Sequence, residues 1–209
     1  MDEAADVADA GFLPLRARKR ALTREAILAA AERLFEERGY DHVTVAEIAD
    51  AANVSVKTLF VYFRSKEDLV FTDTWLIDLC LDALRRRPPG TTPAEAVTHA
   101  LTAVLREGGQ PVSEGIEGFH RGYGGSAALR SRLLRMWEDY EDRITAALAA
   151  EAGTEPTPAM RLQAIGIVGI LRTLISPELR AAVAGLPPDD SLAYVCDWLL
   201  AVGQATGAR

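Results

Sequence analysis

TVAEIADAANVSVKTLFVYFRSKEDL, residues 44–69, holds two short helical patterns that meet across a turn. Thr44 and Glu47 have the spacing of a capping box, in which each side chain satisfies the other residue's backbone N–H, so they predict the start of a helix. Asn53 tolerates the left-handed conformation that ends a helix. Ser55 can then cap a second helix of similar length. The stretch therefore predicts a helix-turn-helix.

Helical patterns also flank this stretch on both sides. Before it, apolar residues recur at the spacing of one helical face, with Thr23 as the expected N-cap and Gly39 as the expected end. After it, residues 65–68 are expected to cap a fourth helix that continues to about Arg87, where the sequence PPG at 88–90 stops it. The apolar face of the first helix consists of Ile27, Ala30, Ala31, Leu34 and Phe35.

The charge distribution favours nucleic acid as a partner of this region, although the whole chain has a net charge of -7. Residues 14–66 carry ten Lys and Arg against seven Asp and Glu. The basic run within residues 16–20 is expected to form a flexible arm on the DNA backbone or in the minor groove, or else a solvated charge run. A small basic module on an acidic body is typical of a DNA reader joined to a regulatory domain.

The outer face of the second short helix carries the side chains that would read DNA. Such a helix can lie in a major groove, with Lys57 and Thr58 on base edges and Val56 against a thymine methyl group. Lys66 and the free N–H groups of the next helix would form a phosphate site. Spacing alone leaves an alternative open: a helical small-molecule-binding or interaction module in which the helix-turn-helix is incidental.

The residue types extend the argument beyond spacing, because residues 18–70 resemble the N-terminal domain of TetR-family transcriptional regulators. The resemblance is carried by Ile27, Ala30, Leu34, Phe35, Gly39, Tyr40, Thr44, Val45, Ile48, Ala49, Val54, Ser55, Thr58, Leu59, Phe60, Tyr62, Phe63 and Ser65 to Leu69. It implies that the helices over 45–52 and 55–63 form the helix-turn-helix and that Thr44 touches a phosphate. The DNA-binding positions that it implies are Thr44, Ser55, Val56, Lys57, Thr58, Phe60, Tyr62 and Lys66.

Three positions depart from the pattern of that family. Asn53 replaces the usual glycine of the turn, which the tolerance of Asn for positive φ makes harmless. Phe60 replaces the usual tyrosine and has no hydroxyl to offer a phosphate. Ala46 has no side chain that could read a base. Direct readout is therefore expected to depend on Lys57 and Thr58.

The whole chain is expected to be all-α, because helix-favouring residues dominate and no alternating β pattern is present. The expected fold is an N-terminal three-helix helix-turn-helix DNA-binding domain followed by a helical ligand-binding and dimerisation domain. The expected divisions are a disordered tail over 1–14, the DNA-binding domain over 15–65 and the regulatory domain over 66–209. Regulatory helices are expected over 93–106, 126–151, 159–175 and 191–203, with a glycine-weakened segment over 112–125.

The helix expected over 159–175 is apolar nearly all round, so it should be covered on every side. Pairing it and the last helix with their copies across a two-fold axis would bury that surface, which is the homodimer that the TetR resemblance implies. Arg172 is a charge in this helix and is expected to pair with an acid across the dimer or to meet an anionic ligand. The expected interface residues are Leu162, Gly166, Gly169, Leu192, Val195 and Leu199.

A small, largely apolar molecule is the expected effector, and it would release operator DNA from a repressor. A pocket for it needs apolar walls and a few polar groups that orient the ligand. For each candidate residue the alternative is an ordinary core position. The candidates are Trp75, Leu79, His99, Ala103, Phe119, Tyr123, Met136, Trp137, Tyr140, Ile170 and Thr173.

Enzyme chemistry is not expected. Glu117 and His120 have the spacing of a carboxylate-bridged metal motif, but the sequence lacks the second copy that such a site needs. Walker, Gly-x-Ser-x-Gly and Cys-x-x-Cys motifs are absent from it as well. Cys80 and Cys196 lie among apolar residues, which is typical of buried free thiols in a reducing cytoplasm. We therefore expect a cytoplasmic protein without a metal, a cofactor or a membrane partner.

Overall fold

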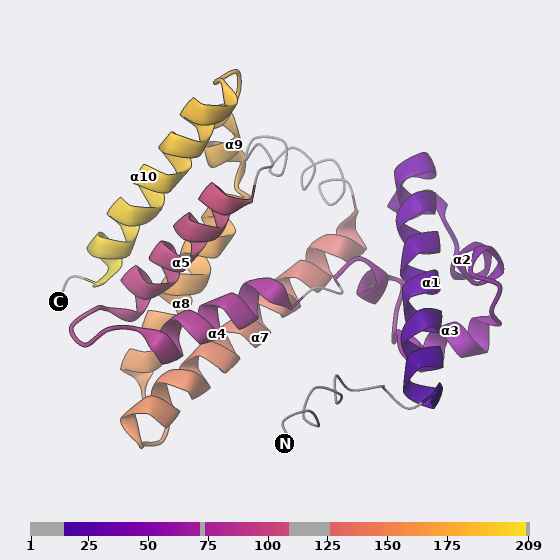
Figure 1. The fold of residues 1–209 in the computed structure, drawn as a ribbon, viewed down its shortest axis with the longest axis horizontal. Coiled ribbons are helices and arrows are strands. Elements are labelled where there is room, and N and C mark those ends of the chain that lie inside the picture. The colour runs from indigo at the N-terminus through magenta and orange to yellow at the C-terminus, as the bar shows by residue number, and fades with distance from the viewer. Residues whose placement is uncertain (1–14, 72–73, 109–125, 208–209) are drawn as a thin grey trace, which may run out of the picture. The chain divides into compact units, whose positions relative to one another are not determined.

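The computed structural model describes residues 15–71, 74–108 and 126–207, and these residues form helices and no β-strand (Figure 1). The expectation of an all-α fold is confirmed for this part of the chain. Two compact units are present, Met1–Thr72 and Asp73–Arg209. Along the chain, the first unit extends past the boundary expected between residues 65 and 66, because Leu69 packs into its core. The tail expected over 1–14 lies outside the described residues.

The N-terminal unit is built around one long helix and two short ones. Helix α1 packs on α2, and α2 packs on α3. Its elements are α1 (Leu15–Arg38), the 3-10 turn η1 (Tyr40–His42), α2 (Val45–Ala51), α3 (Val56–Tyr62) and the 3-10 turn η2 (Glu67–Leu69). The buried core between them consists of Ile27, Ala31, Val43, Ile48, Ala49, Leu59, Phe63 and Leu69.

Local signals form the helix-turn-helix as the sequence predicts. The Thr44 side chain accepts from the backbone N–H of Glu47, and the Glu47 carboxylate accepts from the backbone N–H of Thr44. Asn53 adopts a φ of 53° between the two helices. Ser55 caps α3 by accepting from the backbone N–H of Thr58. The capping box, the left-handed turn and the second cap are therefore confirmed.

The start of α1 differs from the expectation. The helix begins at Leu15, so the basic run over 16–20 is helical and not a flexible arm. The Thr23 hydroxyl donates to the carbonyl of Lys19 within the helix and caps nothing. The physical reason is composition, because the leucine, alanine, arginine and lysine residues of this segment favour a helix.

The expected fourth helix is broken into two elements. Ser65 caps only the short turn η2, and α4 (Trp75–Arg86) begins separately, with the Thr74 hydroxyl donating to Asp78. Leu69 is buried in the core of the N-terminal unit, whereas Ile77 is buried in the core of the C-terminal unit. The chain passes from one unit to the other at this point, and so a single helix over 66–87 does not form.

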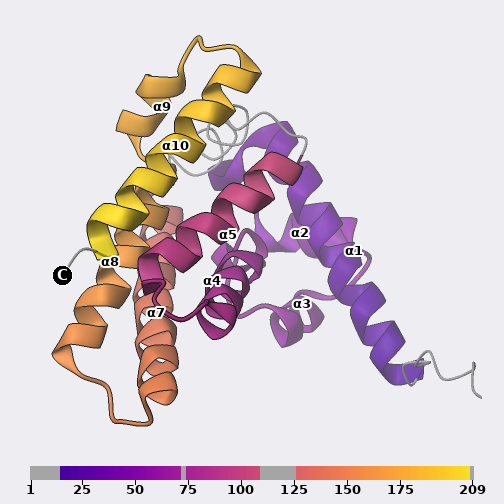
Figure 2. The ribbon, with the colours of Figure 1, turned by 60° about the vertical axis from the view of Figure 1, so that its left-hand side comes forward.

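The C-terminal unit consists of helices that pack as antiparallel neighbours. Figures 1 and 2 show α10 running alongside α5 in the opposite direction, and α8 returning along α7. Its further elements are α5 (Pro93–Glu107), α7 (Ala127–Ala152), α8 (Pro158–Leu174), α9 (Pro177–Val183) and α10 (Pro188–Gly207). The largest buried side chains of its core include Ile77, Val97, Leu129, Ile144, Ile167, Val168, Leu171 and Leu199.

Caps and prolines set the ends of these helices. Thr92 forms a second complete capping box with Glu95, and Pro93 follows at the first helical position. Gly153 ends α7 with a φ of 64°, a conformation that glycine adopts without strain. The expected helices are confirmed within a few residues, except that α10 begins at Pro188 and continues to Gly207. Helix α9 was not expected, although its Ser-Pro start at residues 176–177 is an N-terminal signal.

Cys80 and Cys196 are buried free thiols, as predicted. Burial raises the pKa of Cys80 to about 12, which makes this thiol unreactive. Within the described residues, no single helix combines the length and apolar character of a membrane span; helices α8 and α9 reach them only together, with a bend of 48° between them.

Candidate nucleic-acid interface

Helix α3 presents an exposed face of apolar and basic side chains. Leu59 is fully buried and anchors the helix on the core, which turns the opposite side of the helix outward. Phe60 is 47% exposed and Val61 is 65% exposed, and Val56 and Lys57 are exposed as well. This outward face suits the major groove, where apolar groups meet thymine methyl groups and a lysine meets guanine.

The hydroxyls of Ser55 and Thr58 lie 2.8 Å apart and share a hydrogen bond. The Ser55 oxygen also accepts from the backbone N–H of Thr58 at 3.0 Å. Tyr62 is half-buried beneath the guanidinium of Arg20, which lies 5.8 Å from the centre of its ring. Arg24 lies 5.4 Å from the ring of Phe63 in the same way. The basic end of α1 is therefore attached to α3, and the two helices form one surface.

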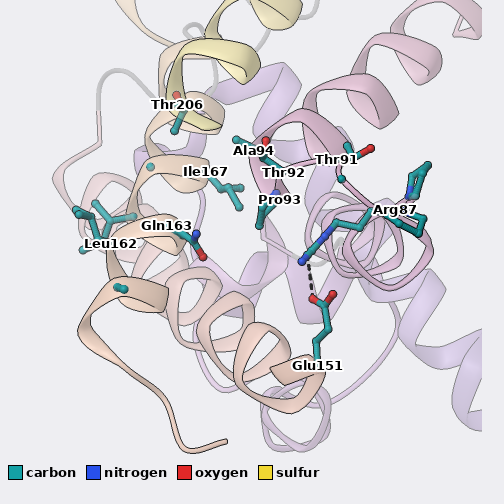
Figure 3. Close-up of a pocket in the computed structure, with 16 residues that line it drawn as sticks. Arg87, Thr91, Thr92, Pro93, Ala94, Glu151, Leu162, Gln163, Ile167 and Thr206 are labelled. Carbon is teal, nitrogen blue, oxygen red and sulfur yellow. Dashed lines mark ion pairs between the residues drawn. The ribbon is translucent and has the colours of Figure 1, made fainter. Parts of the chain in front are cut away.

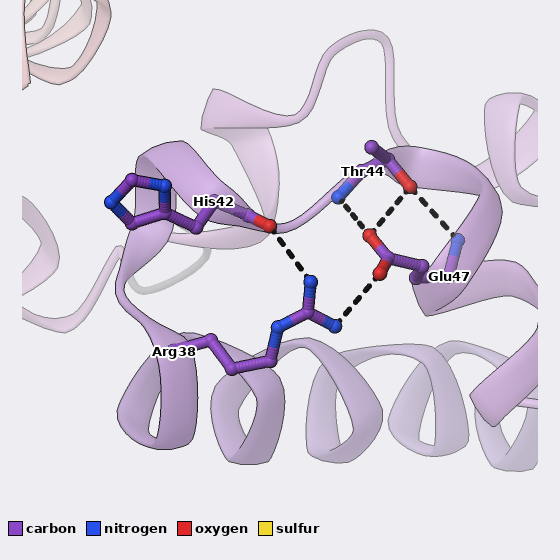
Figure 4. A network of polar contacts seen from close by, with 4 residues as sticks. All are labelled: Arg38, His42, Thr44 and Glu47. Carbon is purple, nitrogen blue, oxygen red and sulfur yellow. Dashed lines mark hydrogen bonds and ion pairs between the residues drawn. The ribbon is translucent and has the colours of Figure 1, made fainter.

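A network at the start of α2 joins the end of α1 to the helix-turn-helix (Figure 4). Arg38 places one nitrogen 2.7 Å from Glu47 and donates from the other to the carbonyl of His42 at 3.0 Å. Glu47 accepts from both the backbone N–H and the hydroxyl of Thr44, each at 2.7 Å. The hydrogen bonds from Thr44, and then the one from Arg38, lower the pKa of Glu47 to about 2. Glu47 therefore stays ionised at neutral pH.

Lys66 is directed into the N-terminal unit. Its ammonium donates to the carbonyl of Tyr40 at 2.5 Å and lies 3.9 Å from the centre of the Tyr40 ring. The ring of Phe35 lies 5.8 Å away. Burial lowers the pKa of Lys66, and the carboxylates of Asp41 and Glu67 oppose that effect. The phosphate contact expected of Lys66 stays a prediction, and the ammonium already has an internal partner.

The described residues among those expected to line a ligand pocket are divided between the core and the surface of the C-terminal unit. Trp137 and Tyr140 are buried in the core, with ring centres 5.5 Å apart in a T-shaped pair. The Thr173 hydroxyl donates to the carbonyl of Gly169 within α8. Of the others, Ile170 is buried, Leu79 and Met136 pack against the core, Trp75, His99 and Ala103 are exposed, and Phe119 and Tyr123 lie outside the described residues.

A hollow of about 970 Å³ lies elsewhere, between the α4–α5 loop, α8 and the end of α10 (Figure 3). Arg87 and Glu151 point towards one another across its edge and form an ion pair at 2.9 Å. Leu162 and Gly166, which were expected at a dimer interface, line it. Sequence reasoning did not single out this hollow, because its walls come from segments that are distant in the chain.

The expected interface residues separate into two groups. Leu162 is 69% exposed, Gly169 is exposed, and Gly166 and Leu192 are half-buried. Val195 and Leu199 are fully buried in the core of the same protomer. The expectation that these two face a partner is therefore corrected, because α10 turns them towards α5.

Helix α8 leaves one face uncovered within the protomer. Ile165 and Arg172 are exposed, and they lie on the same side of the helix as the exposed Leu162 and Gly169. Within one protomer this face of α8 is therefore not covered, so its burial by a second copy and the pairing of Arg172 stay predictions.

Two short helices joined by a tight turn, with an exposed second helix and an attached helical unit, define a helix-turn-helix protein. Residues 27–72 match the sequence model described as "Bacterial regulatory proteins, tetR family". The HTH-type transcriptional regulator TcmR of Streptomyces glaucescens is 35% identical over 147 residues, which are 68% of this chain and 65% of TcmR. The repressor KstR of Rhodococcus jostii is 32% identical over 40% of this chain and 39% of its own length. Residues 27–72 therefore belong to the TetR-family DNA-binding domain, and the chain is similar to TetR-family regulators beyond that domain as well.

Solved structures agree with this assignment at the level of the fold. A TetR-family regulator from Mesorhizobium loti aligns with a TM-score of 0.54 at 22% identity, covering 93% of this chain and 97% of its own. FadR of Thermus thermophilus, a TetR-family repressor solved with lauroyl-CoA, aligns with a TM-score of 0.51 at 22% identity, covering 89% of this chain and 95% of its own. The matched segment spans slightly less than two thirds of TcmR's length.

Proposed function

We propose that this protein is a ligand-responsive transcriptional repressor that binds operator DNA as a homodimer. The observation that carries the proposal is the exposed face of α3, where Val56, Lys57 and Phe60 stand outward while Leu59 is buried. A recognition helix needs this combination, because the buried side fixes its orientation while the exposed side meets base edges.

The proposed roles of the individual side chains follow from their chemistry. Lys57 donates to a guanine, and Val56 contacts a thymine methyl group. The Thr58 hydroxyl already shares a hydrogen bond with the Ser55 hydroxyl. Only its remaining hydrogen-bonding capacity is available for a base. Phe60 lacks a hydroxyl and contributes an apolar contact. Tyr62 completes the surface that we propose for the operator. Lys66 is directed inward and donates to the Tyr40 carbonyl, so only the N–H groups that this bond leaves can reach a phosphate.

The homodimer and the effector are supported by the C-terminal unit and by the relatives. The uncovered face of α8 is an apolar surface of the kind that a second copy would bury. KstR is described as a repressor, and FadR was solved with lauroyl-CoA. A small, largely apolar effector that favours the non-binding conformation would release the operator.

The test is a gel shift with duplex DNA from upstream of the gene for this protein, at several salt concentrations. Binding should weaken steeply with salt, because phosphate contacts release counterions. Lys57→Ala should weaken binding to this duplex by about 1–3 kcal/mol and relax its sequence preference. Arg86→Ala is the control, since Arg86 is an exposed residue of α4 that forms an ion pair with Asp82 one turn away. Fatty acids, titrated into the complex one at a time, test the effector, and a compound that releases the duplex supports this part of the proposal.

The rival function is a helical small-molecule-binding module in which the helix-turn-helix is incidental. It predicts that Lys57→Ala and Arg86→Ala change DNA affinity equally little. It also predicts that the upstream duplex binds no better than a scrambled duplex of the same length.

A further inference from the structure

The hydrogen bonds at the start of α2 decide which side chain there can donate to a phosphate. A phosphate oxygen only accepts hydrogen bonds, so a contact needs a free N–H or O–H group. Thr44 has two candidates, its backbone N–H and its hydroxyl. Both donate to the same oxygen of Glu47 at 2.7 Å. With the capping box closed, Thr44 has no donor left for DNA.

Arg38 lies beside the same turn with donors to spare. Its guanidinium has five N–H groups, and the contacts described for it are those with Glu47 and with the carbonyl of His42. The side chain is 43% exposed, so solvent and ligands reach it. Both partners hold the planar group in one orientation, which lowers the entropy that it would lose on binding a phosphate.

We propose that Arg38 donates to a backbone phosphate of the bound DNA, and that Thr44 acts indirectly by orienting Glu47, which in turn orients Arg38. This inference rests on the proposed DNA-binding function. The first helix of a helix-turn-helix crosses the DNA backbone, and Arg38 is fastened to the first turn of that helix. An arginine suits such a contact because its planar fork matches two phosphate oxygens.

The proposal predicts that substitutions at Glu47 and at Arg38 change DNA affinity in opposite directions. Its carboxylate occupies one side of the guanidinium and repels an approaching phosphate. In Glu47→Gln the negative charge is lost, while the capping box can persist because glutamine also serves at that position. Glu47→Gln should therefore bind DNA more tightly, whereas Arg38→Gln should bind it about tenfold more weakly.

The experiment measures binding of both variants to the upstream duplex and to a scrambled duplex of equal length, over a range of salt concentrations. Arg38→Gln should weaken binding to both duplexes alike and reduce the salt slope by about one per protomer. Thermal unfolding confirms that each variant is folded. Arg85→Gln is the matched control, because Arg85 is an exposed arginine paired with a carboxylate, Asp82, on α4. Its affinity and salt slope should equal those of the wild type.

The outcomes separate the possible failures. If Arg38 only braces α2, both Arg38→Gln and Glu47→Gln will weaken binding, and the salt slope will stay that of the wild type. That result overturns the inference and leaves the proposed function standing. If the wild-type protein prefers neither duplex and shows no salt dependence, the proposed function fails, and the inference fails with it.

Discussion

Glu47 holds the first turn of α2 together, because its two carboxylate oxygens serve different partners. One oxygen accepts from Thr44, and the other lies 2.7 Å from Arg38. The side chain thus links a local cap to a residue of the preceding helix. The cap can be read from the four residues of the capping box, whereas the link to Arg38 depends on how α1 lies against α2.

The Glu47 carboxyl should contribute to the pH dependence of folding. Its pKa is about 2 in the folded protein, below the ordinary 4.5. A depressed pKa stabilises the folded state above pH 4.5, and this contribution is lost as the pH falls from about 4.5 to 2. Urea unfolding at pH 7 should show Glu47→Gln to be less stable than the wild type, with a smaller difference at pH 3. A difference that stays the same at both pH values would contradict the assignment.

At the scale of the element, α10 passes close to α5 at Gly203. The Cα of Gly203 lies close to Thr98, a buried residue whose hydroxyl donates to the carbonyl of Glu95. A Cβ at position 203 would overlap the Thr98 hydroxyl oxygen and lie 3.1 Å from its Cβ. Glycine is therefore required here by the approach of the two helices and not by backbone conformation.

Gly203→Ala should destabilise the C-terminal unit by about 1–3 kcal/mol, because overpacking outweighs the gain in helix propensity. Denaturant unfolding measures this loss. In a Thr98→Ala background, which removes the overlapping hydroxyl, the loss on Gly203→Ala should become smaller. Equal losses in both backgrounds would show that Thr98 is not the residue that limits the approach.

At the scale of the whole molecule, the buried and the exposed apolar side chains of the C-terminal helices have different roles. Val195 and Leu199 fill the protomer core, whereas Leu162 and Ile165 are exposed on α8. Exposed apolar side chains on one helix are a surface that a second copy can bury. The proposed homodimer therefore depends on the exposed group, and the buried group is needed for the protomer itself.

Leu162→Glu should convert the proposed dimer into folded monomers, because it places unpaired charges in an apolar seam. Sedimentation and circular dichroism measure the mass and the helix content together. Leu134→Glu, at another exposed leucine, should leave the dimer intact. Leu199→Asp should instead unfold the C-terminal unit, since it buries a charge in the protomer core. A folded Leu162→Glu dimer would remove this face from the proposal.

The sequence by itself determined the helix-turn-helix and the family. The caps at Thr44 and Ser55, the left-handed turn at Asn53 and the apolar periodicity of α1 each depend on neighbours within a few residues, so they are legible without a structure. Most helices outside residues 109–125 were predictable for the same reason. The break after η2 was not, since a cap signal at Ser65 starts a 3-10 turn and an α-helix equally well.

Only the tertiary structure decided which faces of the helices are buried. Helices α8 and α10 carry apolar residues on several sides, and a periodic pattern of that kind has no single inward direction. Packing against α5 and α7 selected one direction, which buried Leu199 and left Leu162 exposed. Packing within the C-terminal unit also placed Trp137 in the core. In the N-terminal unit, the packing of α1 on α2 brought Arg38 to Glu47. These arrangements join residues that are distant in the chain, and the free energy that selects them comes from burial shared among several helices.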